Sequence, residues 1–271
     1  MKLGRAAVCA FFGAACVSAL WAASARAEAP AGAYTVAIDG DAGLIVPTGE
    51  GEVCEDDGTG GQVCVSTDVS TNANGVVSGS GLVTDVAQAL SVDLDFVGKV
   101  SGTTAKPKLV LAFAATGSAT GLDVAGKGKL VCVPDRGGAP VFACRGKAKL
   151  CAFQLGVKLG CQKVPFDTQV AYARQPFELD LDLQTVLQST VTGAATAQIG
   201  AITIASYAAK GKYKASADAS TLVLKCTDRG VKSSVVLKKV VLAAGAPTAG
   251  TAVFKLMGQK GVVTLPSGGS P

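Results

Sequence analysis

Apolar and acidic side chains alternate without a fault in the stretch Phe177-Glu178-Leu179-Asp180-Leu181-Asp182-Leu183. In an extended strand, successive side chains point to opposite faces, so this stretch predicts a strand with one apolar and one solvent-facing side. Residues 91–97 alternate in the same way. Helical spacing is rare, and only residues 85–90 and 185–189 suit a turn or two of helix. The sequence therefore predicts an all-β protein.

Further strand signals lie on both sides of this stretch and are separated by clusters of Gly with Asp or Asn. We expect additional strands within residues 75–83, 106–113, 128–133, 141–153, 200–206, 222–226 and 231–242. Many strands of moderate length with frequent turns favour an antiparallel sandwich, a barrel or a long curved sheet, with few short helices.

The first 27 residues have the pattern of a secretory signal peptide. Lys2 and Arg5 precede a long apolar run, and small residues lead to a cleavage point after Ala27. An uncleaved membrane anchor and lipidation at Cys16 are the alternatives. We expect a bacterial protein that is periplasmic or secreted after cleavage, with one β domain over residues 28–264 and a flexible tail over 265–271.

A weak internal repeat suggests that this β domain has two similar halves. Residues 129–137 and 223–230 each combine a strand and a cysteine with an Asp-Arg-Gly turn. A Gly-Lys-x-Lys pattern also recurs, and its lysines share one face of their strands. They could bind an anion or simply face solvent; they are Lys127, Lys129, Lys147, Lys149, Lys212 and Lys214.

Six cysteines flank three turns and are expected to form three local disulfides, because residues opposite each other in a hairpin are close enough to bond. The expected pairs are Cys54–Cys64, Cys132–Cys144 and Cys151–Cys161. Cys226 has an apolar residue, near Leu237, at the matching position of the repeat, so it should be buried and free. A zinc site made of cysteines alone is disfavoured, because no Cys-x-x-Cys is present and an exported protein meets an oxidising compartment.

The composition excludes several chemistries. The chain has no His, which excludes Ser-His-Asp and Cys-His nucleophiles and His-ligated metals. Removal of the signal peptide lowers the net charge from +5 to +2, which gives no support for a nucleic-acid partner. No later apolar run is long enough to span a membrane.

Carboxylates offer two further possibilities. Asp93 with Asp95, and Asp180 with Asp182, have a spacing that a glycosidase could use, but a mature chain without Trp lacks the usual stacking platform for a sugar. Acidic residues in Gly-rich loops could hold Ca²⁺, although a solvated acidic loop explains them as well. The candidate ligands are Asp39, Asp41, Glu55, Asp56 and Asp57.

Charge is strongly segregated along the chain. Residues 28–95 carry a net charge of −12 with no Lys or Arg, and residues 96–271 carry +14. We expect the acidic strands to lie against the lysine-bearing strands, either within one chain or head to tail in a homo-oligomer. Otherwise the basic face is a candidate site for an anionic envelope polymer.

These patterns together favour an exported β protein that binds or builds something, with no catalytic residues. A carrier of an apolar ligand or lipid in an open β-barrel is the first alternative, and residues 109–113 and 199–204 could line its cavity. A hydrolase that uses carboxylates is the second. No cofactor is expected beyond the Ca²⁺ that the acidic loops could hold.

Overall fold

The computed structural model describes residues 31–39, 42–56, 58, 60–187, 189–214, 221–228, 233–243 and 245–266. The expected signal peptide, Asp41, Asp57 and the tail beyond residue 266 lie outside these ranges. The described residues form an all-β protein without a helix, and hence without a helix that could cross a membrane.

The described residues form seventeen strands, of which nine overlap the expected segments and eight lie outside them. They are β1 (Gly32–Ile38), β2 (Leu44–Pro47), β3 (Gly49–Asp56), β4 (Gln62–Thr71), β5 (Val76–Asp85), β6 (Leu90–Thr103), β7 (Lys106–Ala119), β8 (Leu122–Pro134), β9 (Val141–Gln154), β10 (Val157–Gln175), β11 (Phe177–Leu187), β12 (Thr190–Ile199), β13 (Ile202–Lys214), β14 (Thr221–Thr227), β15 (Ser234–Ala243), β16 (Ala246–Leu256) and β17 (Gln259–Leu265).

Antiparallel pairing of sequence neighbours builds one long curved sheet, which is one of the three expected arrangements. Each strand from β3 to β9 pairs with the next, and so does each strand from β11 to β16. β1 pairs with β11, and β2 pairs with the end of β10. One short parallel contact joins β17 to β6.

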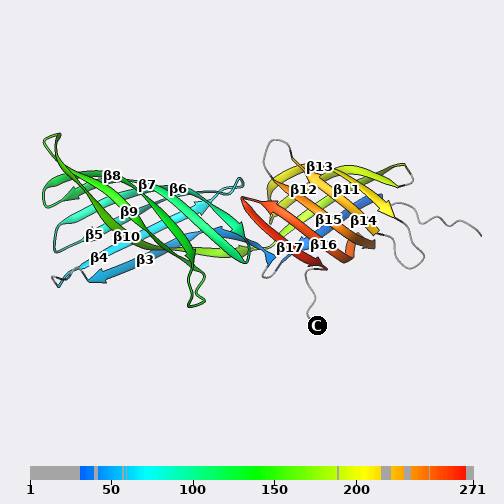
Figure 1. Ribbon diagram of the computed structural model, residues 1–271, viewed down its shortest axis with the longest axis horizontal. Helices are drawn as coiled ribbons and strands as arrows, with labels where there is room; N and C mark the ends of the chain where they lie inside the picture. The colour runs from blue at the N-terminus through cyan, green and yellow to red at the C-terminus, as the bar shows by residue number, and fades with distance from the viewer. Residues whose placement is uncertain are drawn as a thin grey trace, which may run out of the picture.

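The sheet curls around two separate hydrophobic cores, which divide the molecule into two lobes placed end to end (Figure 1). We call β2–β10 the inserted lobe, and β1 with β11–β17 the terminal lobe. The chain leaves the terminal lobe after β1 and returns along β10 and β11, which only Pro176 separates. The lobes are therefore not the two successive halves of the chain.

The alternation in residues 177–183 corresponds to a strand with one buried and one outward face, as the sequence predicts. Phe177, Leu179, Leu181 and Leu183 are buried in the terminal lobe, each at most 2% exposed, and the acidic residues between them face outward. Phe177 meets Phe254 of β16 edge-on, with ring centroids 4.9 Å apart. Both rings belong to the hydrophobic core of the terminal lobe.

The expected helical turns are instead hairpin ends. In residues 85–90, the Gln88 amide donates to the buried Asp85 carboxylate over 3.1 Å, and Ala89 has φ of 44°. A left-handed residue ends any helix, so a tight turn forms. Residues 185–187 continue β11, because Thr185 pairs with Val191 and Leu187 pairs with Thr190 of β12.

Candidate functional site

An apolar cavity of about 360 Å³ lies inside the inserted lobe. It occupies the half of the lobe farthest from the terminal lobe, since its lining residues sit near the hairpin ends of β3–β7, β9 and β10. Its volume falls at the lower end of the range for small-molecule sites, roughly 300–1,000 Å³. The apolar lining residues are Val53, Val63, Val65, Val83, Leu90, Val92, Leu94, Phe113, Ala115, Ala148, Leu150, Val164, Pro165 and Phe166.

Small residues at inward positions make room for this space. Ala115 and Ala148 face inward and are each 1% exposed. On β8 the inward positions next to the lysines are Gly126 and Gly128, where an added Cβ would collide with the side chains of Leu150 and Phe113. The Gly-Lys-x-Lys pattern of β8 therefore has a structural reason, because its glycines let neighbouring side chains lie against the sheet.

The cavity reaches the seam where β3 and β10 meet. Four consecutive residues of β10, 164–167, line the cavity. A strand that faced the cavity with one side would contribute only every second residue, so the edge of β10 borders the space. Farther along the seam, β10 approaches closely: a Cβ at Gly51 of β3 would lie 2.5 Å from the Gln169 carbonyl oxygen, and that oxygen accepts a hydrogen bond over 2.7 Å from the hydroxyl of Thr67 on β4, which stands opposite Gly51. The seam is thus held near Gly51 and borders the cavity near Glu55.

Two carboxylates border the otherwise apolar cavity. Glu55 of β3 and Asp167 of β10 belong to its lining. The Arg145 side chain lies 3.7 Å from the Asp167 carboxylate, and both groups are well exposed. Asp167 stands at an outward position of β10 and Arg145 offsets its charge, so Glu55 is the negative group that would repel an anionic end of a ligand at this edge.

Sequence patterns had pointed to this site only in part. Phe113, in the predicted lining stretch 109–113, lines the cavity, whereas Leu109 and Leu111 are fully buried core residues. The other stretch, 199–204, lies in the terminal lobe, where Ile204 is buried and Ile202 is exposed. No sequence pattern had assigned the other lining residues to a cavity, although several lie in expected strands, and the small inward residue Ala115 is the signal that could have indicated the space.

Three disulfides hold the inserted lobe, and they join the expected pairs. Cys132–Cys144 faces the core, and neither residue is more than 1% exposed. The two others, Cys54–Cys64 and Cys151–Cys161, lie on the outer face near the hairpin ends around the cavity. Disulfides persist in oxidising compartments, and three of them are consistent with a protein that lies outside the cytosol.

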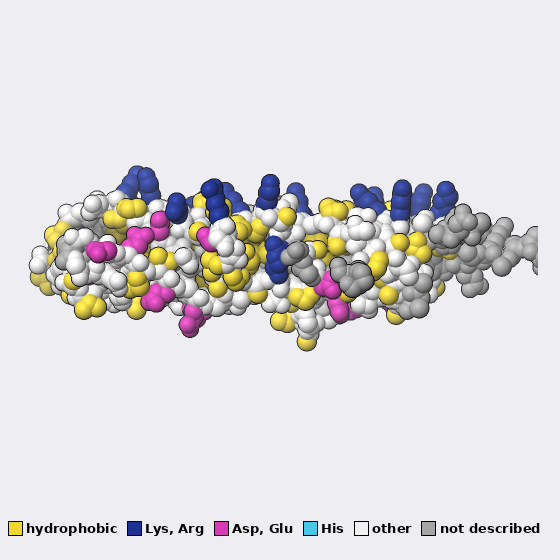
Figure 2. Space-filling model, turned by 90° about the horizontal axis from the view of Figure 1, so that it is seen from below, with side chains coloured by type: hydrophobic (Ala, Val, Ile, Leu, Met, Phe, Trp, Pro, Cys, Tyr) yellow, Lys and Arg dark blue, Asp and Glu magenta, His cyan; other side chains and the backbone are white. Residues whose placement is uncertain are grey.

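The lysines singled out by the repeat are all exposed on outer faces, and those of the inserted lobe cluster together. Lys127 stands opposite Lys149, and Lys129 stands opposite Lys147. Lys212 and Lys214 lie on β13 of the other lobe. Lys and Arg side chains project along one side of both lobes in the space-filling view (Figure 2).

The acidic strands do not lie against these lysines within one chain. Glu50 stands opposite Asp68, and Asp68 opposite Ser80, on the outer face of β3–β5. Asp95 stands two strands away from Lys127, with Ala114 of β7 between them. The two charge sets therefore share the outer surface of one sheet instead of facing each other across a contact.

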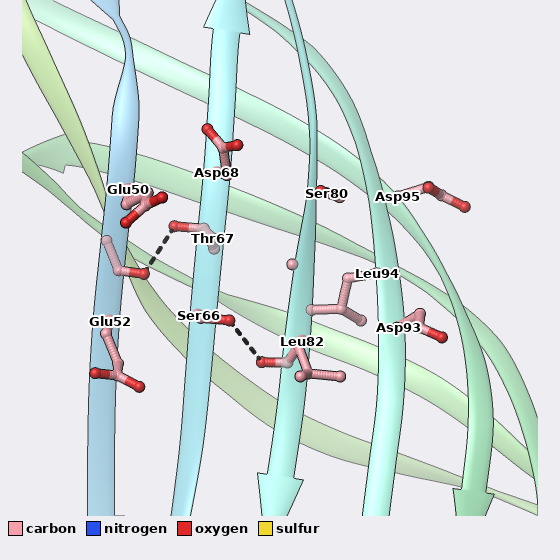
Figure 3. Close-up of a pocket in the computed structure, with 12 residues that line it drawn as sticks. Glu50, Glu52, Ser66, Thr67, Asp68, Ser80, Leu82, Asp93, Leu94 and Asp95 are labelled. Carbon is pink, nitrogen blue, oxygen red and sulfur yellow. Dashed lines mark hydrogen bonds between the residues drawn. The ribbon is translucent and has the colours of Figure 1, made fainter.

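The acidic strands form an open depression on the outer surface, where Asp93 and Asp95 point away from the sheet (Figure 3). Asp180 and Asp182 also face outward, and the Asp180 carboxylate accepts hydrogen bonds from Thr35 and Gln198, both over 2.8 Å. Asp93 and Asp95 lie on the open outer surface of the sheet, and the Asp180 carboxylate is occupied by hydrogen bonds from neighbouring strands. Neither carboxylate pair therefore lies in a cleft, where a hydrolase would hold its substrate.

The candidate calcium ligands that the structure describes do not form a cluster. Asp39 follows β1, whereas Glu55 and Asp56 end β3, and the run from Gly49 to Glu55 alone spans about 20 Å at 3.3 Å per residue. The Asp56 carboxylate accepts a hydrogen bond from the Gly58 amide over 2.7 Å, which is a local turn. Asp41 and Asp57 lie outside the described residues.

A different group of metal-ligand types does come together, at Glu52, Cys54 and Cys64. The two sulfurs are bonded to each other, however, and a metal needs the thiolate form. This group therefore leaves only the Glu52 carboxylate as a ligand.

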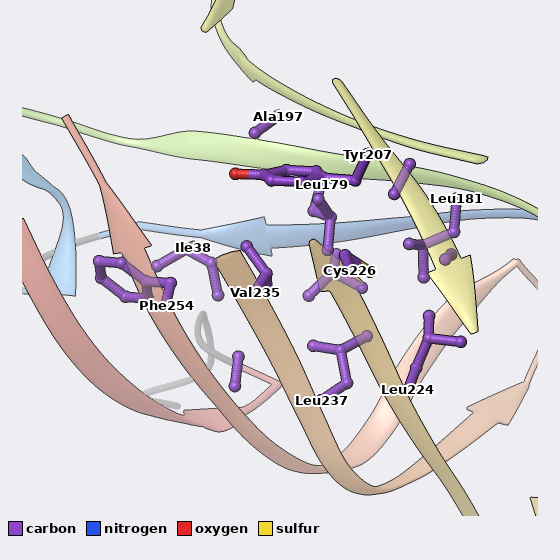
Figure 4. Close-up of a cluster of buried hydrophobic side chains, with 14 of the residues drawn as sticks. Ile38, Leu179, Leu181, Ala197, Tyr207, Leu224, Cys226, Val235, Leu237 and Phe254 are labelled. Carbon is purple, nitrogen blue, oxygen red and sulfur yellow. The ribbon is translucent and has the colours of Figure 1, made fainter. Parts of the chain in front are cut away.

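Cys226 is free and lies in the core of the terminal lobe, among Leu179, Val235 and Leu237 (Figure 4). Val235 stands directly opposite it across β14 and β15, two residues from the expected position near Leu237. Burial raises the pKa of the Cys226 thiol to about 12, so this cysteine stays protonated and unreactive in the folded protein.

Comparison with protein-family models, curated proteins and solved structures gave no match to this chain. The case for a function therefore comes from the geometry alone.

Proposed function

We propose that this chain is an exported, non-enzymatic binding protein that carries a small apolar ligand inside the inserted lobe. The observation that carries the proposal is the apolar cavity of about 360 Å³, which borders the seam between β3 and β10. The disulfides Cys54–Cys64 and Cys151–Cys161 cross-link the hairpins that surround it. Apolar walls bind by removing ligand surface from water, at about 25 cal/mol for each Å² buried.

The contrast between the lobes supports a binding role for the cavity. In the terminal lobe, Phe177 and Phe254 are buried against each other within the core. In the inserted lobe, Phe96, Phe113 and Phe166 are also in contact, with centroid distances of 5.8 and 5.0 Å, yet the space beyond them is open. Lining residues such as Val63 and Val164 are half-buried, although they stand on the inner face.

Charge at the cavity edge narrows the ligand class. The Glu55 carboxylate disfavours a ligand with a carboxylate or phosphate at this edge, so we expect a neutral or cationic apolar molecule. Lipid extraction and mass spectrometry of protein purified from the exported fraction should find such a molecule. A neutral dye such as N-phenylnaphthylamine should bind with one saturable site and should bind more tightly than laurate.

Adjacent alanines on β7 provide a matched pair of variants. Ala115 lines the cavity, and Ala114 faces outward and is exposed. Ala115→Leu should weaken dye binding at least tenfold, whereas Ala114→Leu should leave it unchanged. Val164→Phe, at the half-buried edge of the cavity, provides a second block with less risk to packing. A protein that is empty when purified and binds no apolar dye would contradict the proposal, as would equal effects of the two alanine variants.

A further inference from the structure

A second feature, independent of the cavity, is a concentration of unpaired lysines on the outer face of β8–β10. Lys127 stands opposite Lys149, which in turn stands opposite Lys163 on β10, and Lys129 stands opposite Lys147. All five are exposed, and none has a hydrogen-bond or ion-pair partner among the described residues. Like charges directly opposite each other destabilise a sheet, so the fold gains nothing from this arrangement.

The terminal lobe repeats the feature on β13 and β14. Lys210 stands opposite Lys225, and Lys212 and Lys214 follow at every second position of β13, which places them on the same outer face. These nine lysines of the two lobes are called the lysine face below. They are Lys127, Lys129, Lys147, Lys149, Lys163, Lys210, Lys212, Lys214 and Lys225.

The two lobes present positive charge in the same direction. In Figure 2 most of the Lys and Arg side chains in view project to one side along the length of both lobes, and the Asp and Glu side chains in view lie elsewhere. The lobes are joined by the β17–β6 contact and by the chain itself, which passes from β10 into β11 across Pro176. Such an elongated body with charge along one side matches a flat anionic surface better than a small anion.

Exposed valines stand among these lysines. Val131 follows Lys129 at the next outward position, and Val97 lies in the same register row as Lys129 and Lys147. Val223 stands opposite Lys212 in the terminal lobe. Their side chains are 40%, 58% and 42% exposed, in the order Val131, Val97 and Val223. Lysines mixed with apolar side chains are typical of surfaces that lie on lipid, whereas a hydrophilic polyanion gains nothing from valine.

We propose that the lysine face docks both lobes lengthwise on an anionic lipid surface, with the ammonium groups at the lipid phosphates and the valines at the headgroup level. Docking relieves the repulsion between facing lysines, because lipid phosphates then lie between them. Each lysine near such a surface should contribute roughly fivefold in affinity, and salt should weaken the attraction over about 8–10 Å.

The test is flotation of the full mature chain with vesicles of phosphatidylglycerol and phosphatidylcholine in equal parts, and with phosphatidylcholine alone. The protein should float only with the anionic vesicles, and less so as NaCl rises. Two matched variants neutralise facing lysines, Lys127→Gln with Lys149→Gln in the inserted lobe, and Lys210→Gln with Lys225→Gln in the terminal lobe. Each double variant should bind roughly 25-fold more weakly.

Three control variants separate this docking from other causes. Lys127→Arg with Lys149→Arg keeps the charge and should keep the binding. Glu50→Gln with Asp68→Asn changes the net charge by two units in the opposite direction to the lysine-to-glutamine variants, and it does so on the acidic strands. This variant should change vesicle binding less than twofold. Val131→Ser with Val223→Ser should weaken binding severalfold at unchanged charge.

Several outcomes would overturn the proposal. An effect of the inserted-lobe pair alone would contradict lengthwise docking. Tighter binding of the Glu50/Asp68 variant would show attraction by net charge instead of by this face. Binding to soluble polyphosphate but not to vesicles would identify a hydrophilic polyanion as the partner in place of lipid.

Discussion

The Gln259 carboxamide forms two hydrogen bonds to the backbone of Ile45, although 214 residues separate them in the chain. Its Oε1 accepts from the Ile45 amide over 3.0 Å, and its Nε2 donates to the Ile45 carbonyl over 2.8 Å. Gln259 and Ile45 are each 1% exposed. A side chain of β17 in the terminal lobe thus takes the place of a neighbouring strand for β2 of the inserted lobe, and couples the two lobes.

Removal of this carboxamide should destabilise the junction. Gln259→Leu leaves the Ile45 amide and carbonyl buried without these partners, and each orphaned group costs about 1–3 kcal/mol. We expect a loss of roughly 2–4 kcal/mol in the free energy of unfolding, measured in urea, with faster hydrogen exchange at Ile45. Gln162→Leu, at an exposed position of β10, is the control and should change stability by less than about 0.5 kcal/mol. Equal losses in both variants would show that the two hydrogen bonds contribute little.

The three disulfides should differ in their contribution to stability. Each closes a loop of ten to twelve residues, which by the chain-entropy model adds about 2–3 kcal/mol. Replacing Cys132 and Cys144 by alanine also empties a fully buried site, so that variant should lose roughly 3–5 kcal/mol. The same change at Cys151 and Cys161 should lose only the entropic part. Urea unfolding measures both, and a larger loss for the outer pair would contradict the role assigned to burial.

Reduction should follow the same order. Cys54 and Cys161 are exposed, whereas Cys132 and Cys144 are covered by the core. A mild thiol should therefore open the two outer disulfides in the folded protein and leave Cys132–Cys144 closed until the inserted lobe unfolds. Alkylation and peptide mapping over time would detect the order.

The sequence predicts features that depend on local alternation and turns. Cys151 and Cys161 could be paired because they flank Leu155-Gly156, whose positive φ values of 50° and 79° suit a two-residue hairpin turn. The outward acids and inward leucines of β11 follow from the period of two. Neither feature requires knowledge of distant strands.

The junction and the place of the cavity depend on contacts between distant segments; the sequence predicts only Phe113 of the cavity lining and nothing of the junction. The cavity depends on where β3 meets β10, and Gly51 and Gln169 are more than a hundred residues apart. Likewise, nothing near Gln259 indicates that its partner is Ile45. The opposed lysines were visible as pairs on single strands, but only the register of β8 with β9 places Lys127 against Lys149.

The buried Cys226 thiol and Tyr207 hydroxyl should make the protein less stable at high pH. Burial raises the pKa of Cys226 from 9.0 to about 12 and that of Tyr207 from 10.0 to about 12. Above pH 9 the unfolded chain therefore releases protons that the folded chain retains, so the free energy of unfolding falls as the pH rises toward 12. Cys226→Ala should flatten the fall between pH 9 and 10, where Tyr207 contributes little. An unchanged slope in that variant would show that the thiol already titrates in the folded state.

Neutralising facing lysines should stabilise the fold. Lys149 stands opposite both Lys127 and Lys163, and Lys147 stands opposite Lys129, so Lys147→Gln with Lys149→Gln removes three repulsive contacts. At roughly 0.2–1 kcal/mol for each contact, the gain should be about 1–2 kcal/mol in low salt. Lys212 and Lys214 have Val223 and Thr221 opposite them on β14, so neutralising this pair should change stability by less than about 0.5 kcal/mol.

Added NaCl should raise the stability of the unmodified protein and narrow its difference from the Lys147/Lys149 variant, because salt screens exposed like charges. Had the acidic strands docked onto these lysines within one chain, salt would lower stability instead, so the sign of the salt dependence in urea unfolding distinguishes the two arrangements.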